Sequence, residues 1–198
     1  MQRCLILGVD QPVGQLVATQ LATYADVEVV GFAEAPVSGL PLTAQYNGDA
    51  RKAATYLPAL ADVDTIYSDF TGLDVDWKLE AVFEALRQRR QSVRTVMRSV
   101  AGVDDELTGE LTYPGIDDPK TYLKQQRYGI KIVDEAELPY TVLRPVLDNV
   151  AGSNQVQLIN EGEPVPVRPV TEAALAQVVV DELVSAAHVN QSLAVIGQ

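Results

Sequence analysis

Cysteine and histidine are almost absent from this chain of 198 residues, which holds one of each. Cys4 has no second cysteine to pair with, so an intrachain disulfide is excluded. Cys4 and His188 alone do not supply the ligands of the common zinc sites, and we expect no metal. The sequence also has no Gly-x-Ser-x-Gly and no Gly-Lys-Ser/Thr motif. Zinc, serine-hydrolase and P-loop chemistry are therefore disfavoured.

Basic residues are scarce as well. Lys and Arg total 15 against 27 Asp and Glu, which gives a formal net charge of −12. Proteins that bind nucleic acid need a basic surface to meet the phosphates, so we expect no nucleic-acid partner. No apolar run approaches the ~18 residues of a membrane span, and the first residues lack the pattern of a signal peptide. The expectation is a cytoplasmic protein without a membrane partner.

Hydrophobic residues make up 47% of the chain, enough for one core, and we expect a single domain over 1–198. Apolar runs alternate with helical patterns from end to end, which predicts parallel strands joined by crossover helices. The predicted fold class is α/β, a doubly wound, mostly parallel sheet with helices on both faces. Strands are expected at 4–7, 27–32, 63–68, 93–97, 140–143, 156–159, 165–167 and 193–196, and helices at 12–24, 50–60, 74–90, 119–135 and 171–187.

Two features of this layout bear on partners. No separate substrate domain is evident, so the short portion from about 146 onward is expected to lie on the substrate side. Trp77 lies off the apolar stripe of the helix 74–90 and is expected at a half-covered edge, with a partner surface as the alternative. A monomer and a helix-packed homodimer are both compatible with this pattern.

The turn 8–14 (Gly-Val-Asp-Gln-Pro-Val-Gly) separates the first buried strand from an amphipathic helix. Glycines there let backbone N–H groups approach a pyrophosphate, and the helix adds its positive end. Gln11 stands where the usual dinucleotide fingerprint has a further glycine. The alternative is a strand–helix turn that needs glycines only for its geometry. The residues expected to contact a dinucleotide are Gly8, Asp10, Gln11, Pro12, Val13 and Gly14.

Glu34 ends the second strand, about 20 residues beyond Gly14, where an acidic residue holds the ribose hydroxyls of NAD. A 2′-phosphate would favour arginine there, and no basic residue occurs between Arg3 and Arg51. The sequence therefore predicts NAD or NADP as cofactor, with NAD favoured. A solvated loop glutamate is the alternative.

Further short motifs follow in order along the chain. They are 48–49 (Gly-Asp), 70–72 (Phe-Thr-Gly), 99–102 (Ser-Val-Ala-Gly) and 140–145 (Tyr-Thr-Val-Leu-Arg-Pro). In this order and spacing, the chain resembles the atypical short-chain dehydrogenase/reductases of the NmrA-like group. The resemblance implies an NAD(P)-binding Rossmann fold. It also places Asp49 near the adenine, and Phe70 and Thr71 against the cofactor.

The resemblance further implies a serine and a Tyr-x-x-x-Lys pair, which i,i+4 spacing puts on one helix face. Ser99 and Tyr122 fall at the serine and tyrosine positions, but Gln126 replaces the lysine. Glutamine can bond a ribose hydroxyl, whereas its neutral amide cannot stabilise a phenolate. The alternatives are a strand-end cap for Ser99 and a core aromatic for Tyr122.

Two functions remain open. The leading hypothesis is an NAD(P)-dependent oxidoreductase acting on a small carbonyl, flavin or quinone-type substrate. The alternative is a non-catalytic NAD(P)-binding sensor or regulatory scaffold, which the replacements Gln11 and Gln126 favour. A fold alone does not choose between these functions.

Overall fold

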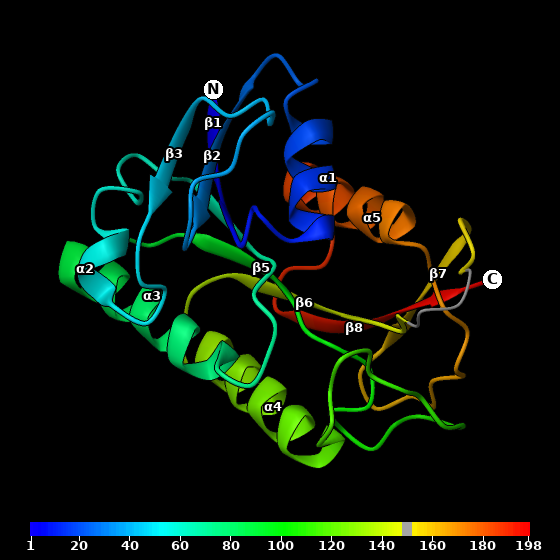
Figure 1. The fold of residues 1–198 in the computed structure, drawn as a ribbon. Coiled ribbons are helices and arrows are strands. Elements are labelled where there is room, and N and C mark those ends of the chain that lie inside the picture. The colour runs from blue at the N-terminus through cyan, green and yellow to red at the C-terminus, as the bar shows by residue number, and fades with distance from the viewer. Residues whose placement is uncertain (148–151) are drawn as a thin grey trace.

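The computed structural model describes residues 1–147 and 152–198. The strands form one eight-stranded sheet in the order β3-β2-β1-β4-β5-β6-β8-β7 (Figure 1). All neighbouring strands are parallel except β7, which runs antiparallel to β8. The strands are β1 (Gln2–Leu7), β2 (Val27–Ala33), β3 (Ala44–Asn47), β4 (Thr65–Ser68), β5 (Arg94–Arg98), β6 (Tyr140–Pro145), β7 (Val156–Asn160) and β8 (Gln191–Gly197).

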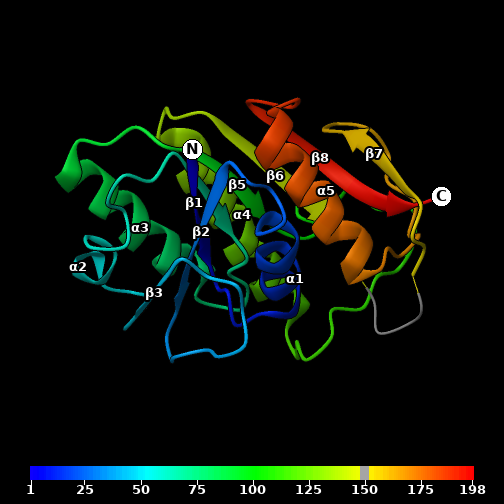
Figure 2. The same ribbon diagram turned by 90° about the horizontal axis from the view of Figure 1, so that it is seen from above.

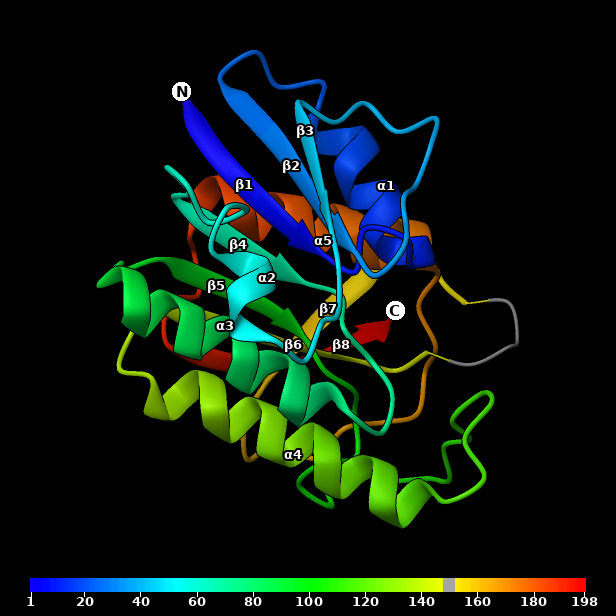
Figure 3. The same ribbon diagram turned by 60° about the vertical axis from the view of Figure 1, so that its left-hand side comes forward.

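Helices cover both faces of the sheet, which confirms the predicted doubly wound α/β fold (Figures 2 and 3). On one face α1 packs against α5, and on the other α3 packs against both α2 and α4. Alternate residues of β1 enter the two cores: Leu5 and Leu7 face α3, and Cys4 and Ile6 face α1. The helices are α1 (Pro12–Leu21), α2 (Ala53–Tyr56), α3 (Val75–Arg89), α4 (Pro119–Glu135) and α5 (Glu172–Ser185).

Three segments differ from the sequence prediction. The edge strand β3 was not expected from the residue pattern, because its residues are only half-buried and carry no apolar alternation. The helix expected over 50–60 is reduced to α2, and Pro58 lacks the N–H that would extend it. Around Pro166 there is no strand, only a single bridge from Leu107 to Val165.

The sheet order creates a crevice at the carboxyl ends of its central strands. After β1 the chain moves to β2 and β3 on one side, and it later returns to place β4 on the other side of β1. The connecting helices therefore diverge to opposite faces at this point, and such switch points are where α/β proteins bind ligands. Within residues 1–147 and 152–198, no helix is long and apolar enough to cross a bilayer.

Candidate cofactor and active site

The turn between β1 and α1 lies at this crevice and depends on its two glycines. Gly8 adopts a φ of 74°, in the left-handed region that favours glycine. A Cβ on Gly14 would stand only 2.5 Å from the Gly8 carbonyl oxygen. The same carbonyl accepts a hydrogen bond from the Gln11 N–H at 2.9 Å. Both glycines are thus required by the close packing of the turn on itself.

Few backbone N–H groups of the turn remain for a ligand. Pro12 begins α1 and has no N–H. The N–H of Gly14 donates to the Asp69 carboxylate at 2.8 Å in the interior. Across the described part of the turn, the N–H groups still without a partner are those of Asp10 and Val13.

Asp69 joins three elements behind the turn. Its carboxylate is fully buried and accepts a hydrogen bond from the Tyr67 hydroxyl at 2.6 Å. It also lies 2.5 Å from the Arg98 Nε atom. Burial raises the pKa of Asp69, and the Arg98 guanidinium opposes that shift. The cluster of Tyr67, Asp69 and Arg98 therefore fixes the ends of β4 and β5 against the start of α1.

A small hollow of about 60 Å³ lies on the β2 side of the turn. Glu34 lines it and accepts a hydrogen bond from the Ala50 N–H at 3.3 Å. Lys78 reaches the hollow from α3, with its Nζ 3.0 Å from Asp74 Oδ1 and 5.6 Å from the centre of the Phe70 ring. The hollow is lined by Gly8, Asp10, Gln11, Glu34, Phe70, Thr71 and Lys78.

A larger cleft of about 570 Å³ opens on the other side of the same turn. Gln11 and Thr71 line both the hollow and the cleft, so they form the boundary between the two. The tail of the chain contributes one wall of the cleft. Besides these two residues, the lining comprises Pro12, Arg98, Ser99, Val100, Tyr113, Pro114, Ile116, Tyr122, Pro145, Leu147, Gly152, Val170, Thr171 and Glu172.

Ser99 and Tyr122 both line this cleft, and Gln126 lies behind Ser99. The Ser99 hydroxyl donates to Gln126 Oε1 at 3.1 Å, while the Gln126 Nε2 atom is buried without a partner. The Tyr122 ring is 8% exposed and lies 5.5 Å from the Tyr113 ring. Burial raises the pKa of the Tyr122 hydroxyl, and the positive charge of Arg98 opposes that shift. The Tyr122 phenol is therefore protonated at neutral pH.

Comparison with known proteins identifies the family of the chain. The model of a family described as NAD(P)H-binding matches residues 11–186. The chain belongs to this NAD(P)H-binding family. A search of the curated proteins gives no match.

Solved structures of short-chain dehydrogenase/reductase type share the fold. A Rossmann-fold NAD(P)-binding family protein from Shigella flexneri is 21% identical, with a TM-score of 0.79 over 100% of this chain and 94% of that one. A short-chain dehydrogenase/reductase from Veillonella parvula, solved with NADP, is 19% identical, with a TM-score of 0.82 over 98% and 94%. An anaerobilin reductase from Escherichia coli O157:H7 is 17% identical, with a TM-score of 0.79 over 99% and 97%. At these identities the likeness concerns the fold.

The other residues that the sequence singled out lie at varying distances from the crevice. The Val13 side chain is buried in the core between α1 and α5, so only its N–H faces the turn. Asp49 lines neither the hollow nor the cleft, and its carboxylate pairs with Arg51 and Lys52. Gln126 is buried behind Ser99 and lines neither of them.

Three residues around the crevice, Arg98, Asp69 and Lys78, were not singled out from the sequence. Arg98 directly precedes Ser99, and Asp69 directly precedes Phe70, so both adjoin motifs that were identified. Lys78 lies six residues after Gly72, on the next helix, and belongs to none of the motifs. A side chain on a helix opposite the turn carries no local sequence signal that it will reach the crevice.

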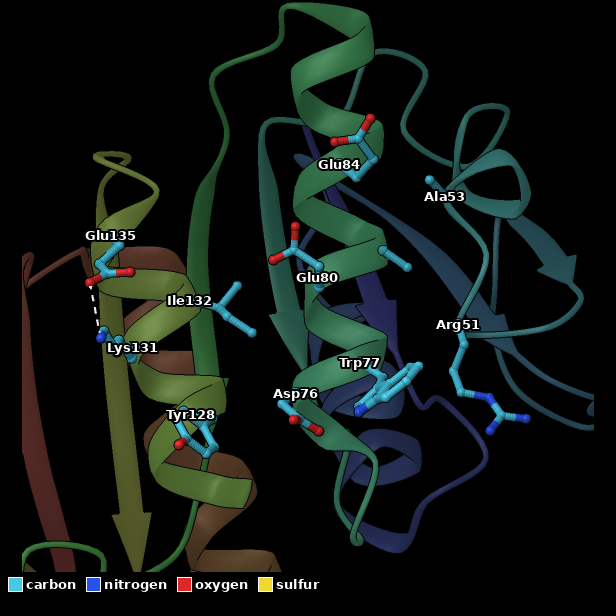
Figure 4. Close-up of a pocket in the computed structure, with 11 residues that line it drawn as sticks. Arg51, Ala53, Asp76, Trp77, Glu80, Glu84, Tyr128, Lys131, Ile132 and Glu135 are labelled. Carbon is cyan, nitrogen blue, oxygen red and sulfur yellow. Dashed lines mark ion pairs between the residues drawn. The ribbon is translucent and has the colours of Figure 1, made fainter. Parts of the chain in front are cut away.

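A third hollow lies away from the strand ends, between α3 and its neighbours α2 and α4 (Figure 4). It measures about 690 Å³, and Trp77 from α3 and Tyr128 from α4 are among its lining residues. Trp77 is 67% exposed, more than the half-covered position expected from the sequence. This groove is separate from the crevice. Within the described residues, no group of three or more His, Cys, Asp or Glu side chains could hold a metal ion.

Proposed function

We propose that the protein is an NAD(P)-dependent oxidoreductase that reduces a small carbonyl, flavin or quinone-type acceptor. The observation that supports this most is the 570 Å³ cleft, where Ser99 and Tyr122 face the start of α1. A cofactor extending from the hollow across Gln11 and Thr71 would place its reactive end in this cleft. An acceptor bound there would meet the Tyr122 hydroxyl as a donor, because the one hydroxyl hydrogen of Ser99 is already given to Gln126.

The bound nicotinamide would supply the hydride, as in other enzymes of this type. Tyr122 would donate a hydrogen bond to the acceptor oxygen, because its buried phenol keeps its proton at neutral pH. Ser99 would line the acceptor site, with its hydroxyl hydrogen held by Gln126 Oε1. The amide nitrogen of Gln126 has no partner, but Gln126 lies behind Ser99 and lines neither space, so its bond to a ribose hydroxyl would require the side chain to turn toward the cleft. Solvent would supply the proton that the reduced acceptor takes up.

NAD is the cofactor that we propose, because the Glu34 carboxylate lines the hollow expected to hold the adenosine. A carboxylate accepts hydrogen bonds from the ribose hydroxyls and repels a 2′-phosphate. The relative from Veillonella parvula carries NADP, so the preference is tested directly by comparing the two cofactors. The reductase from Escherichia coli supports a reductase role within this fold.

The test begins with calorimetric titration of NAD, NADH, NADP and NADPH. We expect binding of at least one dinucleotide, and no binding below millimolar concentration would contradict the proposal. Loss of reduced-cofactor absorbance is then followed across quinones, flavins and aldehydes. Tyr122→Phe should lower turnover by ~10²-fold without changing cofactor affinity. Tyr24→Phe, at an exposed site outside the cleft, is the matched control.

A non-catalytic dinucleotide sensor is the second candidate function. It is favoured by Gln126, which is neutral, buried and bonded to Ser99 where a lysine would otherwise assist the tyrosine. Cofactor binding without turnover of any acceptor, and without an effect of Tyr122→Phe, would support this alternative.

A further inference from the structure

The division between the hollow and the cleft locates the phosphates of a bound dinucleotide. Gln11 and Thr71 line both spaces, and Glu34, the proposed partner of the adenosine ribose, lines the hollow. If the nicotinamide lies in the cleft, as the proposed function requires, then the pyrophosphate crosses at Gln11 and Thr71. The pyrophosphate carries two negative charges at this point, and the protein must balance them.

The turn itself provides little of that balance. Pro12 has no N–H, and the N–H groups of Gln11 and Gly14 are already bonded within the protein. The exposed carboxylate of Asp10 adds a negative charge to the same surface. The helix dipole of α1 is further offset by the buried carboxylate of Asp69 at its start. A positive side chain is therefore needed close to the turn.

Two cations lie beside the crossing point, one on each side. Arg98 lines the cleft, but its guanidinium is held 2.5 Å from the fully buried carboxylate of Asp69. Removing Arg98 from that carboxylate would leave a buried charge without a partner. Lys78 lines the hollow and pairs at 3.0 Å with Asp74, whose side chain is 40% exposed. A pair with an exposed carboxylate is worth little, so Lys78 can exchange it for a phosphate.

We propose that Lys78 binds the cofactor's pyrophosphate and adds its charge to the N–H groups of Asp10 and Val13, the donors that the turn leaves free. The Lys78 Nζ atom lies over the Phe70 ring, 5.6 Å from its centre, and both residues line the hollow. The role differs from the contacts expected of the turn 8–14, because the charge comes from α3 on the opposite side of the crevice. The proposal rests on the proposed dinucleotide binding.

The test compares dissociation constants of NADH and NADPH, measured by calorimetry at low and high salt. Lys78→Met keeps the stem but removes the charge, and it should raise the Kd of both cofactors about tenfold. Lys78→Arg should restore most of the affinity. Asp74→Asn frees Lys78 and removes a neighbouring carboxylate, so it should lower the Kd. Lys131→Met is the matched control, since Lys131 forms an i,i+4 pair with Glu135 on α4 away from the crevice.

Each outcome decides one point. Wild-type affinity in Lys78→Met, or an equal loss in Lys131→Met, would overturn the proposal. A loss confined to NADPH would also overturn it, because Lys78 would then contact a 2′-phosphate. Weaker binding by Asp74→Asn would show that the ion pair itself, and not a phosphate contact, sets the affinity. If the wild-type protein binds neither cofactor, the proposed function fails first, which is a result distinct from all of these.

Discussion

At the scale of single residues, the turn 8–14 keeps a shape set by its glycines, while most of its N–H groups are already bonded within the protein. Its shape depends on Gly8 and Gly14, which approach each other too closely for a side chain. Its donors are reduced by Pro12 and by the bond from Gly14 to Asp69. Shape and ligand chemistry are therefore separate properties of the turn, and substitutions can test them separately.

Gly14→Ala tests the shape. The new methyl group would collide with the Gly8 carbonyl oxygen, and we expect a loss of ~1–3 kcal/mol in unfolding free energy. Urea denaturation measures this loss. Gly109→Ala is the control, because a Cβ there makes only ordinary contacts with Val167. Equal stability of the two variants would contradict the close approach described for the turn.

Cys4 gives a prediction about pH. Burial is the main reason that the pKa of this thiol rises from 9.0 to about 11. The folded protein therefore favours the protonated thiol, and this contribution to stability is complete below pH 9.0 and is lost as the pH rises toward 11. Over that pH range, the unfolding free energy of the wild type should fall relative to that of Cys4→Ala. A thiol-reactive disulfide reagent should label Cys4 only after denaturation, and rapid labelling of the native protein would contradict its burial.

At the scale of elements, α4 is the helix that brings Tyr122 and Gln126 to the crevice. Its first turn is capped by Asp118, whose carboxylate accepts the Thr121 N–H at 3.1 Å and the Thr121 hydroxyl at 2.6 Å. The cap lies one turn before Tyr122. Its integrity therefore affects both the stability of the helix and the position of the tyrosine.

Asp118→Ala should lower the unfolding free energy by ~1 kcal/mol, as expected for loss of an N-cap. The neighbouring exposed Asp117 is the control, because Asp117→Ala removes a carboxylate without removing the cap. Thermal or urea unfolding measures both variants. The same loss in Asp117→Ala would indicate a general charge effect and would exclude capping as the cause.

The elements also show how far sequence reasoning reached. Strands such as β1 and helices such as α4 were predicted because their apolar periods are clear and their ends carry Pro or Asp. The strand β3 was missed because it pairs on one side only and buries no continuous apolar face. Lys78 and Arg98 lie at the crevice because separate elements meet there, and a local sequence pattern does not contain that information.

At the scale of the whole molecule, the crevice lies between two independent layers. The cluster that contains Leu5 and Leu79 faces α3, and the cluster that contains Ile6 and Val179 faces α5. A dinucleotide that crosses the strand ends would contact residues from both sides of the sheet. Its binding energy is therefore coupled to the folding of the entire sheet.

This coupling predicts a thermal shift. A ligand that binds only the folded state adds about 2.7 kcal/mol of stability at a hundred times its Kd. For a chain of this size, that corresponds to a rise of roughly 5–10 °C in melting temperature. Differential scanning fluorimetry with the tightest-binding dinucleotide measures the shift. Lys78→Met should show a smaller rise than Lys131→Met at the same ligand concentration, and identical rises would argue against a role of Lys78.

The central place of β1 in the sheet also has a consequence during protein synthesis. β1 pairs with β2 soon after it is made, but its other edge waits for β4, whose register partners are residues 65–68. Until that segment leaves the ribosome, a fully apolar strand edge that includes Leu5 and Ile6 stays open. Open apolar edges promote association between chains, and parallel pairings of this kind form slowly. We therefore expect nascent chains that end before β4 to be prone to association.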